Sequence, residues 1–237
     1  MSMPIAVLRQ QLAQVLRPPI PDTMGGLATG VESLDAILPA RGLPRGRLTE
    51  VLGARGSGKT TLLRQVVDQT AGHGLWAAYV DARRTLAPGD WARACRSAHG
   101  VWMVRPRAAG AGAWCADVLL RSGAFALVIL DGAPPLTRQV AVRLTRLARD
   151  ADAAFVVAAE DERSATMLGG ALRLRVERAR RPGTRITVEK GGIHRTIEVS
   201  YAISVARCLC THPEVPDRRG VARSRARSAS TCKPPAG

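Results

Sequence analysis

Residues 53–60 read GARGSGKT, which matches the complete G-x-x-x-x-G-K-[ST] pattern of a phosphate-binding loop. Glycines let the backbone wrap closely around a phosphate, and the amide groups of the loop and of the next helix can donate hydrogen bonds to it. Lys59 adds positive charge toward the β and γ phosphates, and the Thr60 hydroxyl suits Mg²⁺. A glycine-rich turn without a ligand is the alternative. We expect the nucleotide site to comprise Gly53, Ala54, Arg55, Gly56, Ser57, Gly58, Lys59, Thr60 and Thr61.

A second part of the same site is predicted by an apolar segment farther along the chain. Residues 127–131 read LVILD, in which four apolar residues precede Asp131. Such a run is typical of a buried central strand, and an acidic residue at its carboxyl end lies over the phosphate crevice of a parallel sheet. We therefore expect Asp131 to hold Mg²⁺ together with Thr60.

Short apolar segments alternate with helical segments around these motifs. Strands are expected at 48–52, 76–81, 101–104, 126–131 and 154–159, and helices at 59–70, 89–98, 113–121 and 136–149. This alternation predicts an α/β fold whose mainly parallel sheet is covered on both faces. After Gly170, apolar and polar residues alternate, which predicts an antiparallel C-terminal extension at 172–176, 185–188 and 196–201, with 203–207 as a further candidate.

The chain divides into three parts by its local composition. Residues 5–16 have apolar side chains at helical spacing, so residues 1–24 are expected to form an N-terminal helix and a linker. Residues 25–210 contain all the motifs and form the expected core. Residues 211–237 are basic and poor in apolar side chains, and we expect this tail to be disordered.

The overall composition limits the class of protein. The chain has 237 residues, and its 35 Lys and Arg residues against 19 Asp and Glu residues give a net charge of +16. Nucleic acid is the commonest partner of so basic a protein, although a genomic base bias toward arginine produces part of the same signal. The five cysteines have no C-x-x-C spacing, and no apolar run is long enough to cross a membrane. We expect a cytoplasmic protein without disulfides or zinc.

Several motifs in order resemble the RecA recombinase ATPase core. Residues 27–63 read LATGVESLDAILPARGLPRGRLTEVLGARGSGKTTLL, and the T-G-x-x-x-L-D phrase, the G-L-P-x-G-R turn and the strand before the loop all match. Residues 78–82 and 120–131 continue the resemblance, which covers residues 27–200. It implies a RecA-like P-loop NTPase fold with ATP and Mg²⁺ as cofactors.

The chain is shorter than RecA, and the segments after the expected strands 126–131 and 154–159, which correspond to the DNA-binding loops of RecA, are reduced. In this respect it is similar to the ImuA family, whose members accompany an inactive Y-family-like protein and a specialised polymerase in bacterial damage-induced mutagenesis. The resemblance implies DNA repair and translesion synthesis in the SOS response. The implied partners are DNA and a repair protein, namely an inactive Y-family-like polymerase homologue, RecA or a second copy, with no membrane.

The sequence departs from the RecA pattern where hydrolysis takes place. RecA proteins end the strand after the loop in D-A-E, whose glutamate activates the attacking water, but here the phrase is Asp81-Ala82-Arg83. A guanidinium stays protonated and cannot accept a proton. Glu160 follows the strand after which the family has a glutamine that senses the γ-phosphate. We assign no catalytic residue, keep Asp81 and Glu160 as candidate substitute bases, and expect weak or absent hydrolysis.

Two further nucleotide contacts are implied by the resemblance. Lys190 fits the first of two lysines that reach the nucleotide of a neighbouring subunit, whereas Gly192 stands at the second position. Trp91 lies near the position of an adenine-stacking tyrosine, and an indole ring is suited to stacking. A helix residue that packs on the core is the alternative for Trp91.

Clustered arginines are the candidate DNA-binding surface. Arginines at alternating strand positions can contact successive phosphates without reading sequence, and such binding depends strongly on salt. In the helix at 136–149, we expect Arg143, Arg146 and Arg149 to form a solvated face, and a face that contacts phosphates or a protein partner is the alternative. The predicted DNA-binding residues are Arg173, Arg175, Arg178, Arg180 and Arg181.

Three functions remain open from the sequence. The leading one is an ImuA-like accessory protein that binds ATP and DNA. The second is a DNA-stimulated RecA-type recombination ATPase, and the third is a non-catalytic adaptor with a vestigial phosphate loop. Whether the protein is an enzyme is therefore left open.

Overall fold

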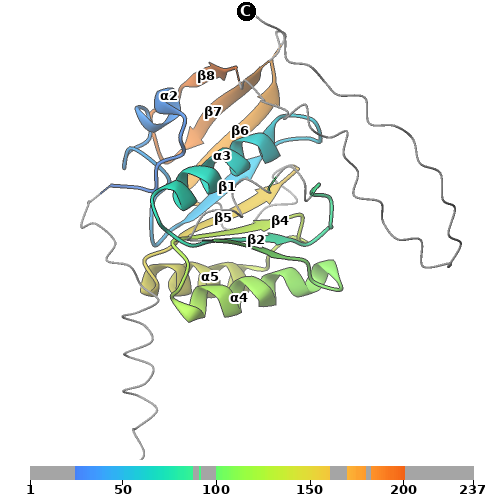
Figure 1. Cartoon of the computed structure of the whole chain (residues 1–237). Helices are drawn as coiled ribbons and strands as arrows, with labels where there is room; N and C mark the ends of the chain where they lie inside the picture. Colours follow the sequence, from blue (N-terminus) through green and yellow to red (C-terminus); the bar gives the residue numbers. More distant parts are fainter. Residues whose placement is uncertain (1–24, 88–90, 92–99, 161–169, 180–182, 201–237) are drawn as a thin grey trace, which may run out of the picture. The chain divides into compact units, whose positions relative to one another are not determined.

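The computed structural model describes residues 25–87, 91, 100–160, 170–179 and 183–200, all of which belong to one compact unit. Its helices and strands are labelled in Figure 1. Their bounds are α2 (Glu32–Asp35), β1 (Leu48–Leu52), α3 (Lys59–Gly72), β2 (Ala77–Asp81), β3 (Val101–Val104), the 3₁₀ turn η3 (Ala109–Ala111), α4 (Gly112–Ser122), β4 (Leu127–Asp131), α5 (Arg138–Asp150), β5 (Ala154–Ala159), β6 (Leu172–Arg178), β7 (Thr184–Lys190) and β8 (Thr196–Val199).

The eight strands that the structure describes form one sheet in the order β3-β2-β4-β5-β1-β6-β7-β8. The strands from β3 to β6 pair in parallel, and β7 and β8 pair antiparallel. The predicted α/β fold with an antiparallel extension is confirmed. β1 and β4 run parallel with β5 between them. The phosphate loop after β1 and Asp131 at the end of β4 therefore lie together at the carboxyl ends of the strands.

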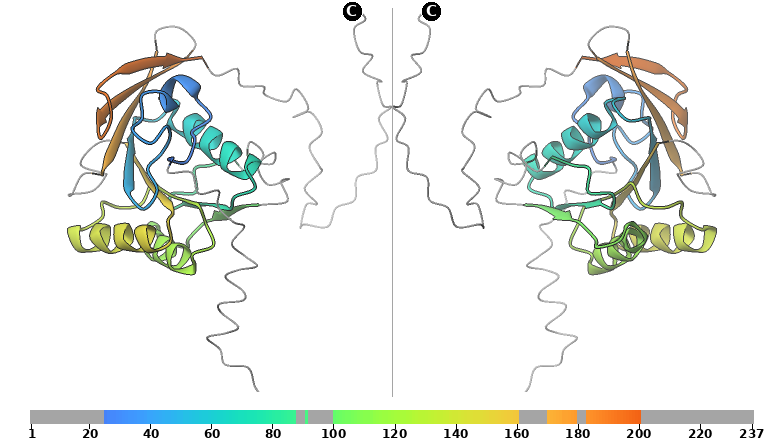
Figure 2. Two further views of the ribbon diagram at one scale, coloured as in Figure 1. Left: turned by 90° about the vertical axis from the view of Figure 1, so that its left-hand side faces the viewer. Right: turned by 90° about the vertical axis from the view of Figure 1, so that its right-hand side faces the viewer.

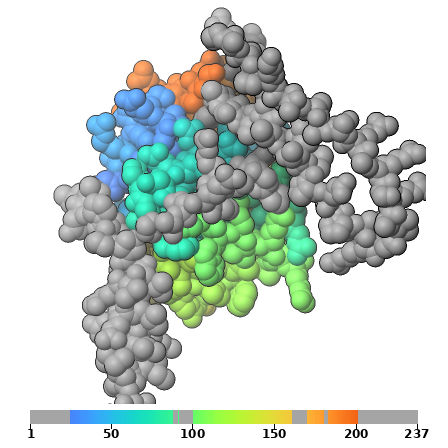
Figure 3. Space-filling model, in the orientation of Figure 1, coloured from blue at the N-terminus to red at the C-terminus, as the bar shows by residue number. Residues whose placement is uncertain are grey.

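Side chains alternate between the two faces of the sheet, and helices cover both. Ala77 and Tyr79 of β2 pack in the core under α3, whereas Ala78 and Val80 pack in the core under α4 and α5. Figures 1 and 2 show α3 on one face and α4 with α5 on the other, and the space-filling view shows the outer sides of α3 and α4 at the surface (Figure 3). Burying each large aliphatic side chain here stabilises the fold by about 1.5–3 kcal/mol.

Several sequence predictions lie outside the described residues. These are the N-terminal helix and linker at 1–24, the helix at 89–98 apart from Trp91, the candidate strand at 203–207 and the tail at 211–237. The strand predicted at 196–201 is observed as Thr196–Val199. Within the part of the chain that the structure describes, no helix combines the length and the apolar character needed to span a bilayer.

Candidate nucleotide-binding site

The phosphate loop links the buried strand β1 to the first turn of α3. The Gly53 amide donates to the Ala159 carbonyl over 3.1 Å, which ties the loop to the end of β5. Gly56 and Gly58 have φ angles of +76° and +95°, a left-handed region that favours glycine. Gly58 is also the N-cap of α3 and offers no side chain to cap the helix, and the first helical amide, that of Lys59, donates to the Ser57 hydroxyl of the loop over 3.3 Å. The loop therefore presents its backbone to a ligand.

Neighbouring strands press against the inner side of this loop. A Cβ at Gly53 would lie 2.5 Å from the Val176 carbonyl oxygen, and one at Gly58 would overlap the Thr184 hydroxyl. A Cβ at Gly56 would meet no atom within 4 Å, and Ala54 and Arg55 beside it are exposed. The outer side of the loop is thus open, and its glycines fit the close approach of a phosphate group.

The Lys59 side chain extends from the first residue of α3 toward the carboxyl end of β5. Its Nζ donates to the Ala159 carbonyl over 2.9 Å. Burial lowers the pKa of Lys59, an effect that the negative charges of Asp131 and Glu160 oppose and the positive charge of Arg83 adds to. The ammonium thus lies within electrostatic reach of these three side chains, where a phosphate group would gain from its charge.

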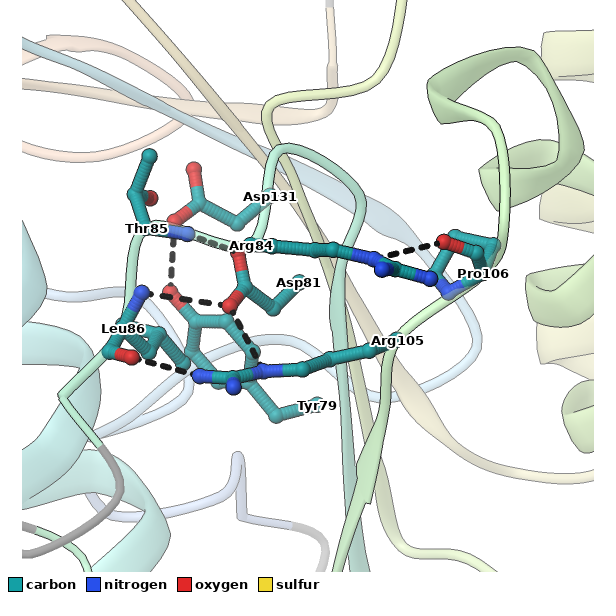
Figure 4. A network of polar contacts seen from close by, with 8 residues as sticks. All are labelled: Tyr79, Asp81, Arg84, Thr85, Leu86, Arg105, Pro106 and Asp131. Atoms are coloured by element: carbon teal, nitrogen blue, oxygen red, sulfur yellow. Dashed lines mark hydrogen bonds and ion pairs between the residues drawn. The ribbon is translucent and has the colours of Figure 1, made fainter. Parts of the chain in front are cut away.

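Asp131 is held by a residue that the sequence interpretation missed. The Tyr79 hydroxyl donates to an Asp131 carboxylate oxygen over 2.7 Å (Figure 4). Burial raises the pKa of Asp131, whereas the Tyr79 hydrogen bond and the Lys59 charge lower it. Tyr79 lies within β2 opposite Ile129 of the neighbouring parallel strand β4, and Asp131 lies two residues beyond Ile129 on the same face of the sheet. This two-residue alternation is the signal that could have found the pair.

The donor atoms near the loop suit a hard cation. The Thr60 hydroxyl on the exposed first turn of α3 and the Asp131 carboxylate are oxygen ligands of the kind that Mg²⁺ prefers. Within the described ranges, no group of three or more His, Cys, Asp or Glu side chains is placed to hold a metal ion. A magnesium ion here would therefore depend on phosphate oxygens as well.

Arg83, at the position where the resemblance implies a glutamate, forms an ion pair. Its Nη1 lies 2.7 Å from Glu160 Oε1, and Arg55 Nε of the phosphate loop lies 3.3 Å from the same oxygen. The pKa of Glu160 is lowered, first by the hydrogen bond from Arg55. Desolvation opposes this shift, and the charges of Arg83 and Arg55 with the Arg83 hydrogen bond lower the pKa further. A carboxylate with a lowered pKa is a weaker base, which argues against Glu160 as a substitute for the missing glutamate.

Asp81, the other candidate base, is engaged in the turn after β2 (Figure 4). It is 1% exposed, accepts from the amides of Thr85 and Leu86 over 3.0 and 3.1 Å, and forms a 3.2 Å ion pair with Arg105. Arg105 also donates to the Leu86 carbonyl, and Arg84 donates to the Pro106 carbonyl over 3.1 Å. These contacts favour a structural role in which Asp81 shapes the turn that carries Arg83.

Trp91 lies in the core beneath α3. It is 2% exposed, and its ring meets Tyr79 edge to face at a centroid distance of 5.0 Å. This arrangement is typical of core packing. It favours core packing of Trp91 over adenine stacking, because a nucleotide base could contact the buried ring only after the ring moved.

Lys190 lies at the far end of β7 from the phosphate loop. Thr184, which begins β7, lies beside Gly58, whereas Lys190 pairs with Arg173 near the start of β6. A strand of seven residues separates the two ends by about 20 Å. Lys190 therefore cannot reach the loop of its own chain, and a nucleotide contact from it requires a second copy.

The predicted DNA-binding arginines differ in their surroundings. Arg173 forms a 2.9 Å ion pair with the fully buried Glu50, and Arg175 pairs with Glu189 on β7. Arg178 is exposed at the end of β6. Arg180 and Arg181 lie outside the described residues. The pairing of Arg173 and Arg175 within the sheet favours a structural contribution from these two and leaves Arg178 as the accessible one of the three described.

Comparisons with known proteins agree with this arrangement. A family model described as the RecA N-terminal domain matches residues 20–146, which contain the phosphate loop, Arg83 and Asp131. Protein RecA of Thioalkalivibrio sulfidiphilus is 37% identical over 111 residues, which are 47% of this chain and 32% of that protein. Protein RecA of Corynebacterium diphtheriae is 36% identical over 133 residues, which are 56% of this chain and 34% of that protein. The matched part spans about a third of the length of these relatives.

Proposed function

This chain belongs to the RecA N-terminal domain family, and from that premise we propose that it binds ATP with Mg²⁺, binds DNA, and hydrolyses ATP slowly or not at all. We further propose an ImuA-like role in DNA repair, as an accessory of translesion synthesis in the SOS response. Its protein partner would be an inactive Y-family-like polymerase homologue, RecA or a second copy of the chain. In this view ATP mainly stabilises one conformation of the protein.

The observation that carries this proposal is the contrast between the binding and hydrolytic parts of one site. The glycine loop and Lys59 retain the chemistry that holds phosphates, and Thr60 with Asp131 would hold Mg²⁺, which supplies charge neutralisation for a bound triphosphate. The position of the water-activating glutamate holds Arg83, which is paired with Glu160. Asp81 and Glu160 are both engaged by arginines.

The direct test is to measure Mg²⁺-ATP binding and turnover by the full chain, with and without DNA. We expect ATP to bind and turnover to be slow in both conditions. Fast turnover that DNA stimulates would contradict the proposal and support a recombination ATPase. A complete lack of nucleotide binding would support the non-catalytic adaptor instead.

Restoring a carboxylate at position 83 is expected to raise the turnover of ATP. We expect the double variant Arg83→Glu with Glu160→Gln to hydrolyse ATP about tenfold faster than the unaltered chain, because a general base commonly contributes at least that much. The second change is needed because two adjacent carboxylates would repel each other and the triphosphate. Steady-state phosphate release at saturating Mg²⁺-ATP measures the effect, so that a change in affinity does not hide it.

The matched control is Arg146→Glu, which reverses the same charge on the exposed face of α5. It should leave turnover unchanged. If the double variant binds ATP but releases phosphate no faster, then the missing base is not what limits hydrolysis.

DNA binding is expected to depend on Arg178. Arg178→Ala should weaken binding to DNA severalfold and reduce the slope of log affinity against log salt by about one, because it removes one phosphate contact. Fluorescence anisotropy across a salt series measures both. Arg121→Ala on α4, where Arg121 is paired with Asp117, removes the same charge elsewhere and should have less effect. Equal effects from the two variants would indicate net charge alone and contradict a site at Arg178.

A further inference from the structure

We propose that Arg55 and Arg83 form a clamp for the terminal phosphate of the nucleotide, and that Glu160 occupies this clamp until a triphosphate displaces it. The inference rests on the proposed function, because it needs a nucleotide in the phosphate loop. It assigns to Arg83 a positive role in selecting ATP over ADP.

Three segments that are distant in sequence converge at this point. Arg55 comes from the loop after β1, Arg83 from the turn after β2, and Glu160 from the end of β5. A single Glu160 oxygen, Oε1, accepts from both guanidinium groups, at 3.3 Å from Arg55 and 2.7 Å from Arg83. The carboxylate therefore bridges the phosphate loop to the β2 turn.

The order of the strands places this bridge on the terminal side of a bound nucleotide. Starting from the loop after β1, the next strands in the sheet are β5, β4 and β2. Lys59 Nζ contacts the end of β5, Asp131 ends β4, and Arg83 follows β2. A phosphate loop of this kind would hold the inner phosphates, and its lysine would reach the β and γ phosphates. A γ-phosphate would thus lie toward Arg83, whereas a diphosphate would end at Lys59.

Charge and exposure favour the exchange of partners. Arg55, Arg83 and Glu160 are 78%, 42% and 41% exposed, and exposed ion pairs of this kind are weak. Near them, Lys59 adds a third cation, whereas Asp131 would be neutralised by Mg²⁺. A γ-phosphate offers three acceptor oxygens and more charge than one carboxylate, and the fork of a guanidinium matches phosphate geometry. The γ-phosphate should therefore displace Glu160 as the partner of Arg55 and Arg83.

The test compares affinities of the full chain for Mg²⁺-ATP and Mg²⁺-ADP by titration calorimetry. Arg83→Ala is expected to weaken ATP binding by about tenfold and ADP binding by less than about twofold, because it removes a charge-assisted contact to the terminal phosphate alone. Glu160→Gln is expected to strengthen ATP binding by about threefold, since it removes the anion that competes for the clamp. Arg121→Ala and Asp150→Asn, which make the same charge changes on α4 and α5, should leave the ratio of the two affinities unchanged.

The outcomes separate the clamp from the function on which it rests. An unaltered chain that binds neither nucleotide overturns both. If the unaltered chain binds nucleotide, the clamp alone is overturned when Arg83→Ala lowers both affinities equally or leaves both unchanged, or when Glu160→Gln leaves ATP binding unchanged or weaker.

Discussion

Lys59→Ala is expected to weaken Mg²⁺-ATP binding by about 100-fold, because a hydrogen bond to a charged group in a partly buried site contributes about 1.5–3 kcal/mol. The ammonium lies at the edge of the sheet, held by the Ala159 carbonyl and close to Asp131. Alanine removes both the donor and the charge. Titration calorimetry with the full chain measures the change in affinity.

The loss should not result from unfolding. Burial lowers the pKa of Lys59, so the charged side chain is less stable in the folded chain than in the unfolded one at neutral pH. Removing it should leave the midpoint of urea denaturation unchanged or slightly higher. Lys190→Ala is the matched control, because that lysine lies at the opposite end of β7, and it should leave binding by a single chain unaffected. Equal affinities of the Lys59→Ala variant and the unaltered chain would show that the loop is not the nucleotide site.

Asp81→Ala is expected to lower the free energy of unfolding by about 3 kcal/mol. The buried carboxylate accepts from two backbone amides and pairs with Arg105, so its removal leaves the amides of Thr85 and Leu86 without their acceptor. The turn that carries Arg83 should loosen as well. Urea denaturation gives the change in the free energy of unfolding. Asp81→Asn should lower this free energy less than Asp81→Ala, because the oxygen of the asparagine amide can still accept a hydrogen bond.

A carboxylate in an exposed ion pair provides the comparison for Asp81. Glu198 on β8 pairs with Arg185 on β7 at 2.8 Å, and the two side chains are 57% and 42% exposed. Glu198→Ala should hardly shift the midpoint of denaturation, because exposed ion pairs contribute little. If Asp81→Ala proved as mild as Glu198→Ala, the network around Asp81 would not be what holds the turn.

The elements of the fold were predicted closely because their signals are local. The strands at 48–52, 101–104 and 154–159 coincide with β1, β3 and β5, and α3 runs two residues beyond the predicted helix. Apolar runs and helical spacing arise because one or both faces of a strand or helix are buried, and this pattern can be recognised within a single short segment of the sequence. The phosphate loop was equally clear, because its glycines and lysine are contiguous.

The sequence placed Asp131 near the phosphate loop but did not predict the direct contacts between side chains of distant residues. Arg83 and Glu160 are separated by 77 positions, and Tyr79 and Asp131 by 52. Their side chains meet only because β2, β4 and β5 are neighbours in the sheet. The pairing of β1 with β6 likewise engages Arg173 with Glu50, where the sequence suggested an arginine available to DNA.

The sequence by itself determined a mainly parallel sheet, through the alternation of short apolar and helical segments. It also determined the phosphate loop and the Asp81-Ala82-Arg83 phrase after the next strand, because each of these is a contiguous run of residues. The tertiary structure alone decided which charges face one another: that Glu160 bridges Arg55 and Arg83, that Asp81 is engaged in a turn, and that Lys190 lies far from its own loop. The physical reason is that charge pairing depends on strand order and register, which bring together side chains from segments that the linear order keeps apart.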